Sequence, residues 1–164
     1  SADVTLVAAW LTTSAGGAIA SLNCSQNDAI TGKRSRDNDG CGPWIYGEQL
    51  EGWTALCSSF SGTSITSLNF SGCELKPEAL ISLADAIKFM GAVACMTLDD
   101  NKTIGATGAD SLMESICTTR NTQIVKIKHD VGALQLPFQL VVRTACQLSD
   151  VRMHLLVALI VRHL

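Results

Sequence analysis

The stretch ITSLNFSGC, residues 65–73, is followed 28 residues later by VACMTLDDN, residues 93–101. Both place apolar residues at their first, fourth and sixth positions and end on a small thiol or amide side chain. An earlier segment, IASLNCSQN at residues 19–27, has the same spacing, and residues 122–130 form a degraded fourth copy. The apolar residues alternate with polar ones, which predicts a strand with one buried face in each copy.

Helical spacing lies beside these strands. Small or apolar residues recur every four positions, which is one face of an α-helix. They are Gly52, Leu56 and Phe60, then Ala79, Leu83 and Ile87, then Gly108, Leu112 and Ile116. We also expect an N-terminal helix in which Leu6 and Trp10 cover the first strand. Because no single unit can bury its apolar side alone, the units must stack.

The motif LDDNKTIGATGADSL, residues 98–112, resembles the leucine-rich repeat family, most closely the ribonuclease-inhibitor-like subclass. This resemblance spans about residues 15–130. It implies an α/β solenoid, a short right-handed horseshoe with parallel strands on its concave face and helices on its convex face. The chain is then one domain over residues 1–164. We expect an N-terminal helix or cap at 1–18, four repeats at 19–130, an inserted loop at about 31–47, and a degenerate C-terminal repeat or cap at 131–164.

One polar column is expected at the turns that follow the strands. A buried side chain there can hydrogen-bond backbone groups of adjacent coils that would otherwise stay unsatisfied. The column is Asn27, Cys73, Asn101 and Asp130. Asn27 and Asn101 fit this role well, Cys73 is accepted at this place in the resembled family, and Asp130 departs from the pattern.

The surplus residues between the first two copies are polar, rich in glycine and mixed in charge, which predicts an exposed loop. Cys41 beside Gly42 and Pro43 suggests a thiol redox motif, but Trp44 occupies the place of the second cysteine. A turn is the better interpretation. Trp44 and Tyr46 either pack back onto the domain or serve as binding anchors, and we favour packing.

Composition excludes several classes of function. A net charge of −3 and a pI near 5.5 argue against nucleic-acid binding. The C-terminal apolar run at residues 155–161 is too short to cross a bilayer, and it is compatible with a strand or a capping helix. Seven cysteines without paired spacing indicate reduced thiols and an intracellular protein, with no metal site and no cofactor.

The resemblance to leucine-rich repeat proteins implies a non-catalytic protein-interaction module that binds a protein partner through its concave face. If that face binds, the partner carries mixed charge; the same side chains are equally compatible with a merely soluble surface. The expected contact residues are Asn23, Ser25, Asn69, Ser71, Thr97, Asp99, Lys126 and Lys128. The alternative is a structural scaffold subunit, held in a larger complex by its apolar C-terminal end and its inserted loop. An enzyme using Cys41 or His129 is the third and weakest hypothesis.

Overall fold

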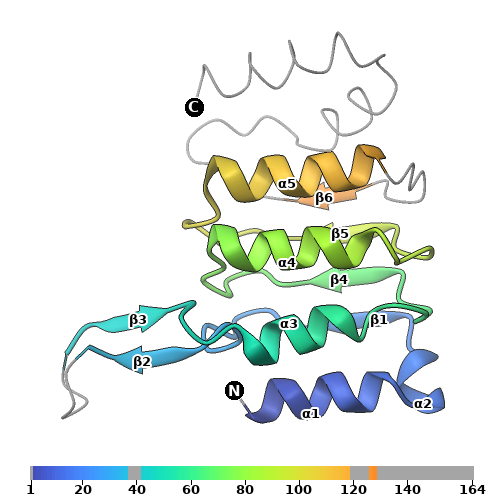
Figure 1. Ribbon diagram of the computed structural model, residues 1–164, viewed down its shortest axis with the longest axis horizontal. Helices are drawn as coiled ribbons and strands as arrows, with labels where there is room; N and C mark the ends of the chain where they lie inside the picture. The colour runs from blue at the N-terminus through green and yellow to red at the C-terminus, as the bar shows by residue number, and fades with distance from the viewer. Residues whose placement is uncertain (1, 37–41, 119–125, 129–164) are drawn as a thin grey trace, which may run out of the picture.

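The computed structural model describes residues 2–36, 42–118 and 126–128 of the 164-residue chain. Helices and strands alternate along most of it (Figure 1). In chain order the elements are α1 (Ala2–Leu11), α2 (Ser14–Gly17), β1 (Ser21–Asn23), β2 (Lys33–Ser35), β3 (Trp44–Tyr46), α3 (Glu51–Ser58), β4 (Ser67–Asn69), α4 (Pro77–Ile87), β5 (Cys95–Thr97), α5 (Gly105–Thr118) and β6 (Lys126–Lys128).

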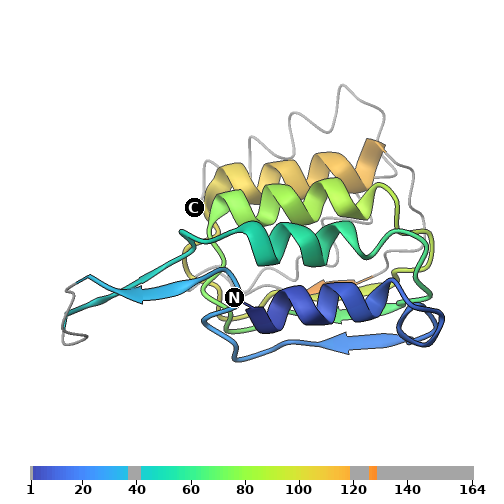
Figure 2. The same cartoon turned by 60° about the horizontal axis from the view of Figure 1, so that its bottom comes forward.

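The main sheet is parallel, with strand order β1-β4-β5-β6. Figure 2 shows α1, α3, α4 and α5 side by side on one face of this sheet. Each strand therefore pairs with the next strand of the series, and a helix crosses over between them. These features confirm the expected mixed α/β fold with a small parallel sheet.

The core lies between the sheet and the helices. Leu68 and Met96 are opposite each other in the strand register and are fully buried. The rings of Trp53 and Phe70 meet edge to face, with centroids 5.0 Å apart and planes at 74°. The Trp53 indole N–H also donates a 2.8 Å hydrogen bond to the carbonyl of Ala79, so one aromatic side chain ties α3 to α4.

The small residue Gly108 sets the spacing of the last two helices. A Cβ at this position would lie 3.0 Å from the Cα of Pro77 and 3.1 Å from the Cβ of Leu80. Gly108, Leu112 and Ile116 are buried against α4, as the periodicity predicts. Close helix contact here depends on the missing side chain.

The orientation of α1 differs from our expectation. Val4, Ala8 and Leu11 form its buried side, whereas Leu6 and Trp10 are exposed. The prediction that Leu6 and Trp10 cover the first strand is therefore wrong. Because α1 carries apolar residues all round, four-residue periodicity selects two different sides equally well.

The inserted segment is more ordered than the predicted loop. β2 and β3 pair antiparallel, with Lys33 opposite Tyr46 and Ser35 opposite Trp44, and the hairpin projects from the domain (Figure 1). Strands of three residues carry too little alternation to be recognised in the sequence. The C-terminal segment 131–164 lies outside the described residues.

No helix in the described part of the chain has the length and apolar character needed to span a membrane.

Replacing Trp53 with Phe should lower the free energy of unfolding by about 1–2 kcal/mol, because the hydrogen bond to Ala79 and part of the ring packing are lost. Urea denaturation measures this change. Trp44 is 52% exposed, so Trp44→Phe is the matched control and should cost less than about 0.5 kcal/mol. Equal losses in the two variants would contradict the assigned role of Trp53.

Candidate functional site

The outer face of the parallel sheet is the face opposite the helix layer (Figure 2). Small uncharged side chains lie in rows across it. Ser21, Ser67 and Cys95 form one row in strand register, and Asn23, Asn69 and Thr97 form another. The side chains on β1 are exposed and those on β4 and β5 are half-buried. None of these six residues is charged, so this face offers hydrogen-bonding groups and no formal charge.

The fourth strand is shifted relative to the sequence prediction. Lys126 lies opposite Cys95, and Lys128 lies opposite Thr97. Aligning residues 122–130 with residues 93–101 places Lys126 opposite Thr97 and Lys128 opposite Asp99. That expected register is therefore wrong by two residues. A shift of two preserves the alternation of a strand, which is why hydrophobic pattern alone did not exclude the wrong register.

Asn23 and Asn69 adopt the same side-chain geometry at the ends of their strands. The side-chain oxygen of Asn23 accepts a 3.0 Å hydrogen bond from the backbone N–H of Ser25. That of Asn69 accepts from the backbone N–H of Ser71 at 3.0 Å and from its hydroxyl at 2.8 Å. Within the described residues, neither side-chain amide nitrogen donates a hydrogen bond. Two oriented amide donors are thus available on the outer face.

A repeated turn follows each of the first three strands. Gln26, Gly72 and Asp100 occupy equivalent positions and have φ values of 60°, 63° and 58°. This left-handed conformation is strained for Gln26 and Asp100, and glycine adopts it freely. The strain must be compensated by contacts that hold the turns in place.

The Asn101 side chain supplies such contacts to the turns at Gly72 and Asp100. It is buried, and it bonds backbone groups of two successive β/α units, here called coils: its own coil and the preceding one. Its oxygen accepts from the N–H groups of Cys73 and Leu75, both at 3.1 Å, and its nitrogen donates to the carbonyls of Phe70 at 2.8 Å, Leu98 at 2.9 Å and Asp99 at 3.2 Å. One amide therefore bonds five backbone groups, and four of these hydrogen bonds are buried.

The buried thiol of Cys73 occupies the equivalent position one coil earlier. Its Sγ donates to the carbonyl of Cys24 at 3.1 Å and interacts with the backbone of Asn27. Asn27 itself is exposed, which corrects the expectation of a buried side chain there. Each column residue bonds the coil before it, and β1 is the first strand of the sheet, so Asn27 has no such coil to bridge. Asp130 lies outside the described residues.

Lys33 connects the hairpin to the domain. Its Nζ lies 2.6 Å from Asp28, 4.8 Å from the centre of the Trp44 ring and 5.4 Å from that of Tyr46. The hydrogen bond to Asp28 is the main cause of a raised pKa at Lys33. Trp44 is held by this cation and remains 52% exposed, so it does not pack onto the core.

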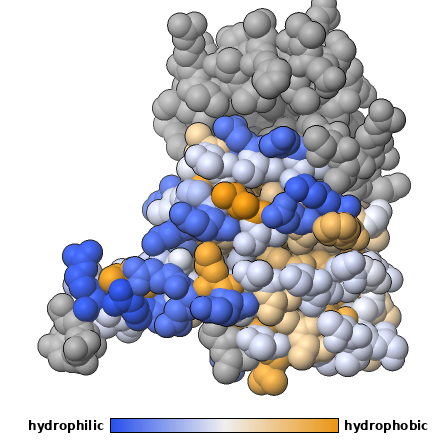
Figure 3. Space-filling view, in the orientation of Figure 1, coloured by the Kyte–Doolittle hydropathy of each residue, from blue (hydrophilic) through white to orange (hydrophobic). Residues whose placement is uncertain are grey.

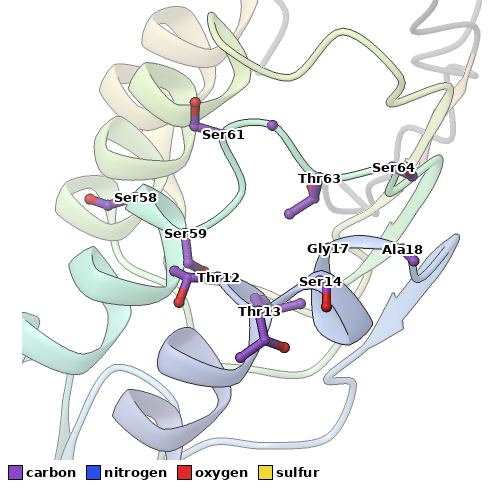
Figure 4. A pocket seen from close by; sticks show the side chains of 12 residues that line it. Thr12, Thr13, Ser14, Gly17, Ala18, Ser58, Ser59, Ser61, Thr63 and Ser64 are labelled. Carbon is purple, nitrogen blue, oxygen red and sulfur yellow. The ribbon is translucent and has the colours of Figure 1, made fainter.

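A hydroxyl-lined hollow of about 480 Å³ lies at the ends of α1 and α3 (Figure 4). No titratable side chain lines it. Most of its hydroxyl groups donate to backbone carbonyls one turn earlier, namely those of Thr12, Thr13, Ser58, Ser59 and Thr63. The hollow can hold a polar group but offers no acid or base.

Three of the described cysteines, Cys24, Cys57 and Cys73, are free thiols whose burial disfavours the reactive thiolate. Burial raises the pKa of Cys24 and Cys57, and it raises that of Cys73 to about 11 against a partly opposing hydrogen bond from the Asn27 backbone. Among the described residues, no group of three His, Cys, Asp or Glu side chains is placed to hold a metal ion. Cys41 and His129 lie outside them, and the absence of a cofactor stays a prediction.

Comparison with known proteins gives structural neighbours only. No family model matches the chain, and no curated protein matches it. A solved structure described as "Leiomodin-1 Actin-Binding Site 2 (ABS2)" has a TM-score of 0.52 and 10% identity, over 87% of this chain and 84% of that one. A tropomodulin C-terminal domain from Caenorhabditis elegans has a TM-score of 0.46 and 10% identity, over 93% of this chain and 96% of that one.

The family prediction is corrected by these findings. We expected a leucine-rich repeat protein of the ribonuclease-inhibitor-like subclass, but a solved structure that shares the fold of this chain is a leiomodin-1 domain, and no family model matches. The apolar spacing of residues 98–112 reports a buried strand followed by a covering helix. Parallel β/α units in general need that spacing, so it does not define a family.

Two surface features were not predicted from the sequence: the exposed apolar side of α1 and the Lys33 cation held by the hairpin aromatics. A count of apolar residues on every side of α1 would have revealed the first. The second depends on the register of β2 and β3, and no sequence signal indicates it.

Replacing Asn101 with Ala should destabilise the protein by at least about 3 kcal/mol, because several buried backbone groups lose their partner and each costs about 1–3 kcal/mol. Chemical denaturation measures the loss. Asn69→Ala removes a partly exposed asparagine of the adjacent coil and should cost less than about 1 kcal/mol. If Asn101→Ala loses no more unfolding free energy than Asn69→Ala, the coil-bridging role of Asn101 is refuted.

The thiol of Cys73 should make stability fall at alkaline pH. The pKa of this thiol is raised in the folded chain, so the protonated thiol favours the folded state. Its contribution to stability is complete below the thiol pKa of the unfolded chain and is lost as the pH rises toward about 11. Unfolding free energies under reducing conditions should decline above about pH 9 more steeply in the wild type than in Cys73→Ala, by up to ~1.4 kcal/mol per pH unit. Parallel pH profiles would exclude this contribution.

Proposed function

We propose that this chain is a non-catalytic protein-interaction domain that binds a protein partner through the outer face of its parallel sheet. The observation that carries this proposal is the pair of in-register asparagines, Asn23 and Asn69, whose oxygens are bonded to the following turns. Their amide N–H groups face outward with their orientation already set. A donor that is ordered before binding loses less conformational entropy on binding.

The partner is expected to present hydrogen-bond acceptors to these two amides. Backbone carbonyls of an extended segment and carboxylate side chains both fit. Acidic residues follow β5, at Asp99 and Asp100, and two lysines lie in β6, which supports a partner of mixed charge. That the sheet is the concave side of a curved horseshoe stays a prediction, and the proposal needs only its uncovered outer face.

Actin is the first partner to test. The leiomodin-1 structure that shares this fold is described as an actin-binding site. At 10% identity the likeness concerns the fold alone. Actin is therefore chosen only as the first protein to test for binding to this chain.

A structural subunit of a larger complex is the second candidate. One specific observation favours it: α1 exposes large apolar side chains, with Leu6 69% and Trp10 46% exposed. Such side chains are normally covered by a partner when they form a continuous patch. The apolar C-terminal end that first suggested this role lies outside the described residues.

We further propose that the chain is not an enzyme and acts inside the cell. The unreactive thiols and the uncharged hollow support the first statement. The free cysteines support the second, since secreted domains usually pair theirs.

Binding should be lost when the outer face is made bulky and charged. We expect Asn23→Arg combined with Asn69→Arg to weaken binding to purified actin at least tenfold in co-sedimentation and titration assays. Thr54→Arg adds a similar side chain on the exposed side of α3 and should change binding less than twofold.

If actin does not bind, the same three proteins are used for affinity capture from cell extract. Partners recovered with the wild type and Thr54→Arg but absent with the double variant would support the outer face. Identical recoveries with all three proteins would refute it.

A further inference from the structure

The first helix exposes an apolar strip on the side away from the core. Leu6 is 69% exposed, Trp10 46% and Val7 36%. Leu6 and Trp10 are four residues apart, so they lie on one side of α1. In Figure 3 apolar atoms reach the lower end of the molecule, where α1 runs. Three large exposed side chains within two turns form a patch that water solvates poorly.

The strand beneath this helix has an open edge. β1 is the terminal strand of the sheet, and only β4 pairs with it among the described residues. The carbonyl of Ala20 and the N–H of Cys24 bond the β4 side. Since residues two apart in a strand point to the same neighbour, the backbone groups of Ser21 and Asn23 point to the open edge. Both residues are exposed.

The apolar strip and the open edge lie at the same end of the stack of units (Figures 1 and 2). Inside the stack, α3 packs between α1 and α4, and β4 pairs with both β1 and β5. Among the described residues, the terminal unit, formed by α1 and β1, has such neighbours on one side only. A partner that covers this end therefore has to supply a strand for the open edge of β1 and an apolar helix surface for the strip on α1.

We propose that a second copy of this chain covers it, in a two-fold dimer that pairs β1 with β1 antiparallel and packs α1 against α1. A two-fold interface requires a self-complementary surface. An edge strand pairs with its own copy when antiparallel, and an apolar strip packs on its own copy without charge conflict. The one charged residue of α1 is Asp3, at its N-terminal end.

The available area is sufficient for a weak to moderate dimer. Leu6, Val7 and Trp10 together expose roughly 300 Å² per copy, and two copies supply roughly half of the ~1,200 Å² found in small stable interfaces. The strand edges and the flanking side chains of Thr5, Ala9, Ser21 and Asn23, which are all exposed, provide the remainder. The sheets of the two copies would then form one continuous sheet.

The test is the solution mass of the full chain over about a thousandfold range of concentration, by sedimentation velocity and light scattering. The wild type should rise from 17.4 kDa toward twice that value. Leu6→Glu and Trp10→Glu should each weaken self-association at least tenfold. Ser21→Pro, which removes a backbone donor at the open edge, should weaken it as well.

Phe89→Glu is the matched control, because Phe89 is as exposed as Leu6, at 69%, and lies beyond the end of α4. It should leave the mass profile unchanged. A monomeric wild type at every concentration would overturn the proposal. So would self-association that persists in Leu6→Glu and Trp10→Glu, because another part of the chain would then form the contact.

Discussion

Successive β/α units can stack only if the backbone groups at the turns between them find hydrogen-bond partners. The Asn101 amide meets this requirement for five such groups, from Phe70 to Asp99, and four of the five hydrogen bonds are buried. Cys73 acts in the same way on the coil before it, with a weaker thiol donor. These side chains hold two turns with positive φ and keep Leu68 opposite Met96, so the core and the outer face both depend on them.

The direction of this bridging explains why the two sides of β1 differ. Each column residue bonds the coil that precedes it, so the first strand has a bonded neighbour on one side and an open edge on the other. Asn27 is exposed for the same reason. The apolar outer side of α1 lies at this open end. The outer face of the sheet and the open end share β1: the side chain of Asn23 belongs to the outer face and its backbone to the open edge, so partner binding and self-association meet at this strand.

Much of the fold follows from the sequence because buried strands and helices require distinct periods. The positions of β4 and β5 and the buried sides of α4 and α5 are predictable from Leu68, Met96, Leu83 and Leu112. The side that α1 buries is not, because its apolar residues surround the helix. The β6 register was wrong by two residues, which alternation cannot detect. Strand alternation predicts that Asn23 and Asn69 lie in one row on the outer face. Their hydrogen bonds to Ser25 and Ser71 depend on side-chain rotamers, which alternation does not determine.

Native-state hydrogen exchange of backbone amides tests the coil-bridging account most directly. The N–H groups of Cys73 and Leu75 are bonded to a buried side chain, so they should exchange only when the whole domain unfolds. The N–H groups of Ser21 and Asn23, at the open edge, should exchange by local fluctuation in dilute solution. Exchange at Cys73 and Leu75 as fast as at Asn23 would contradict the account, since Asn101 would then not hold the turns.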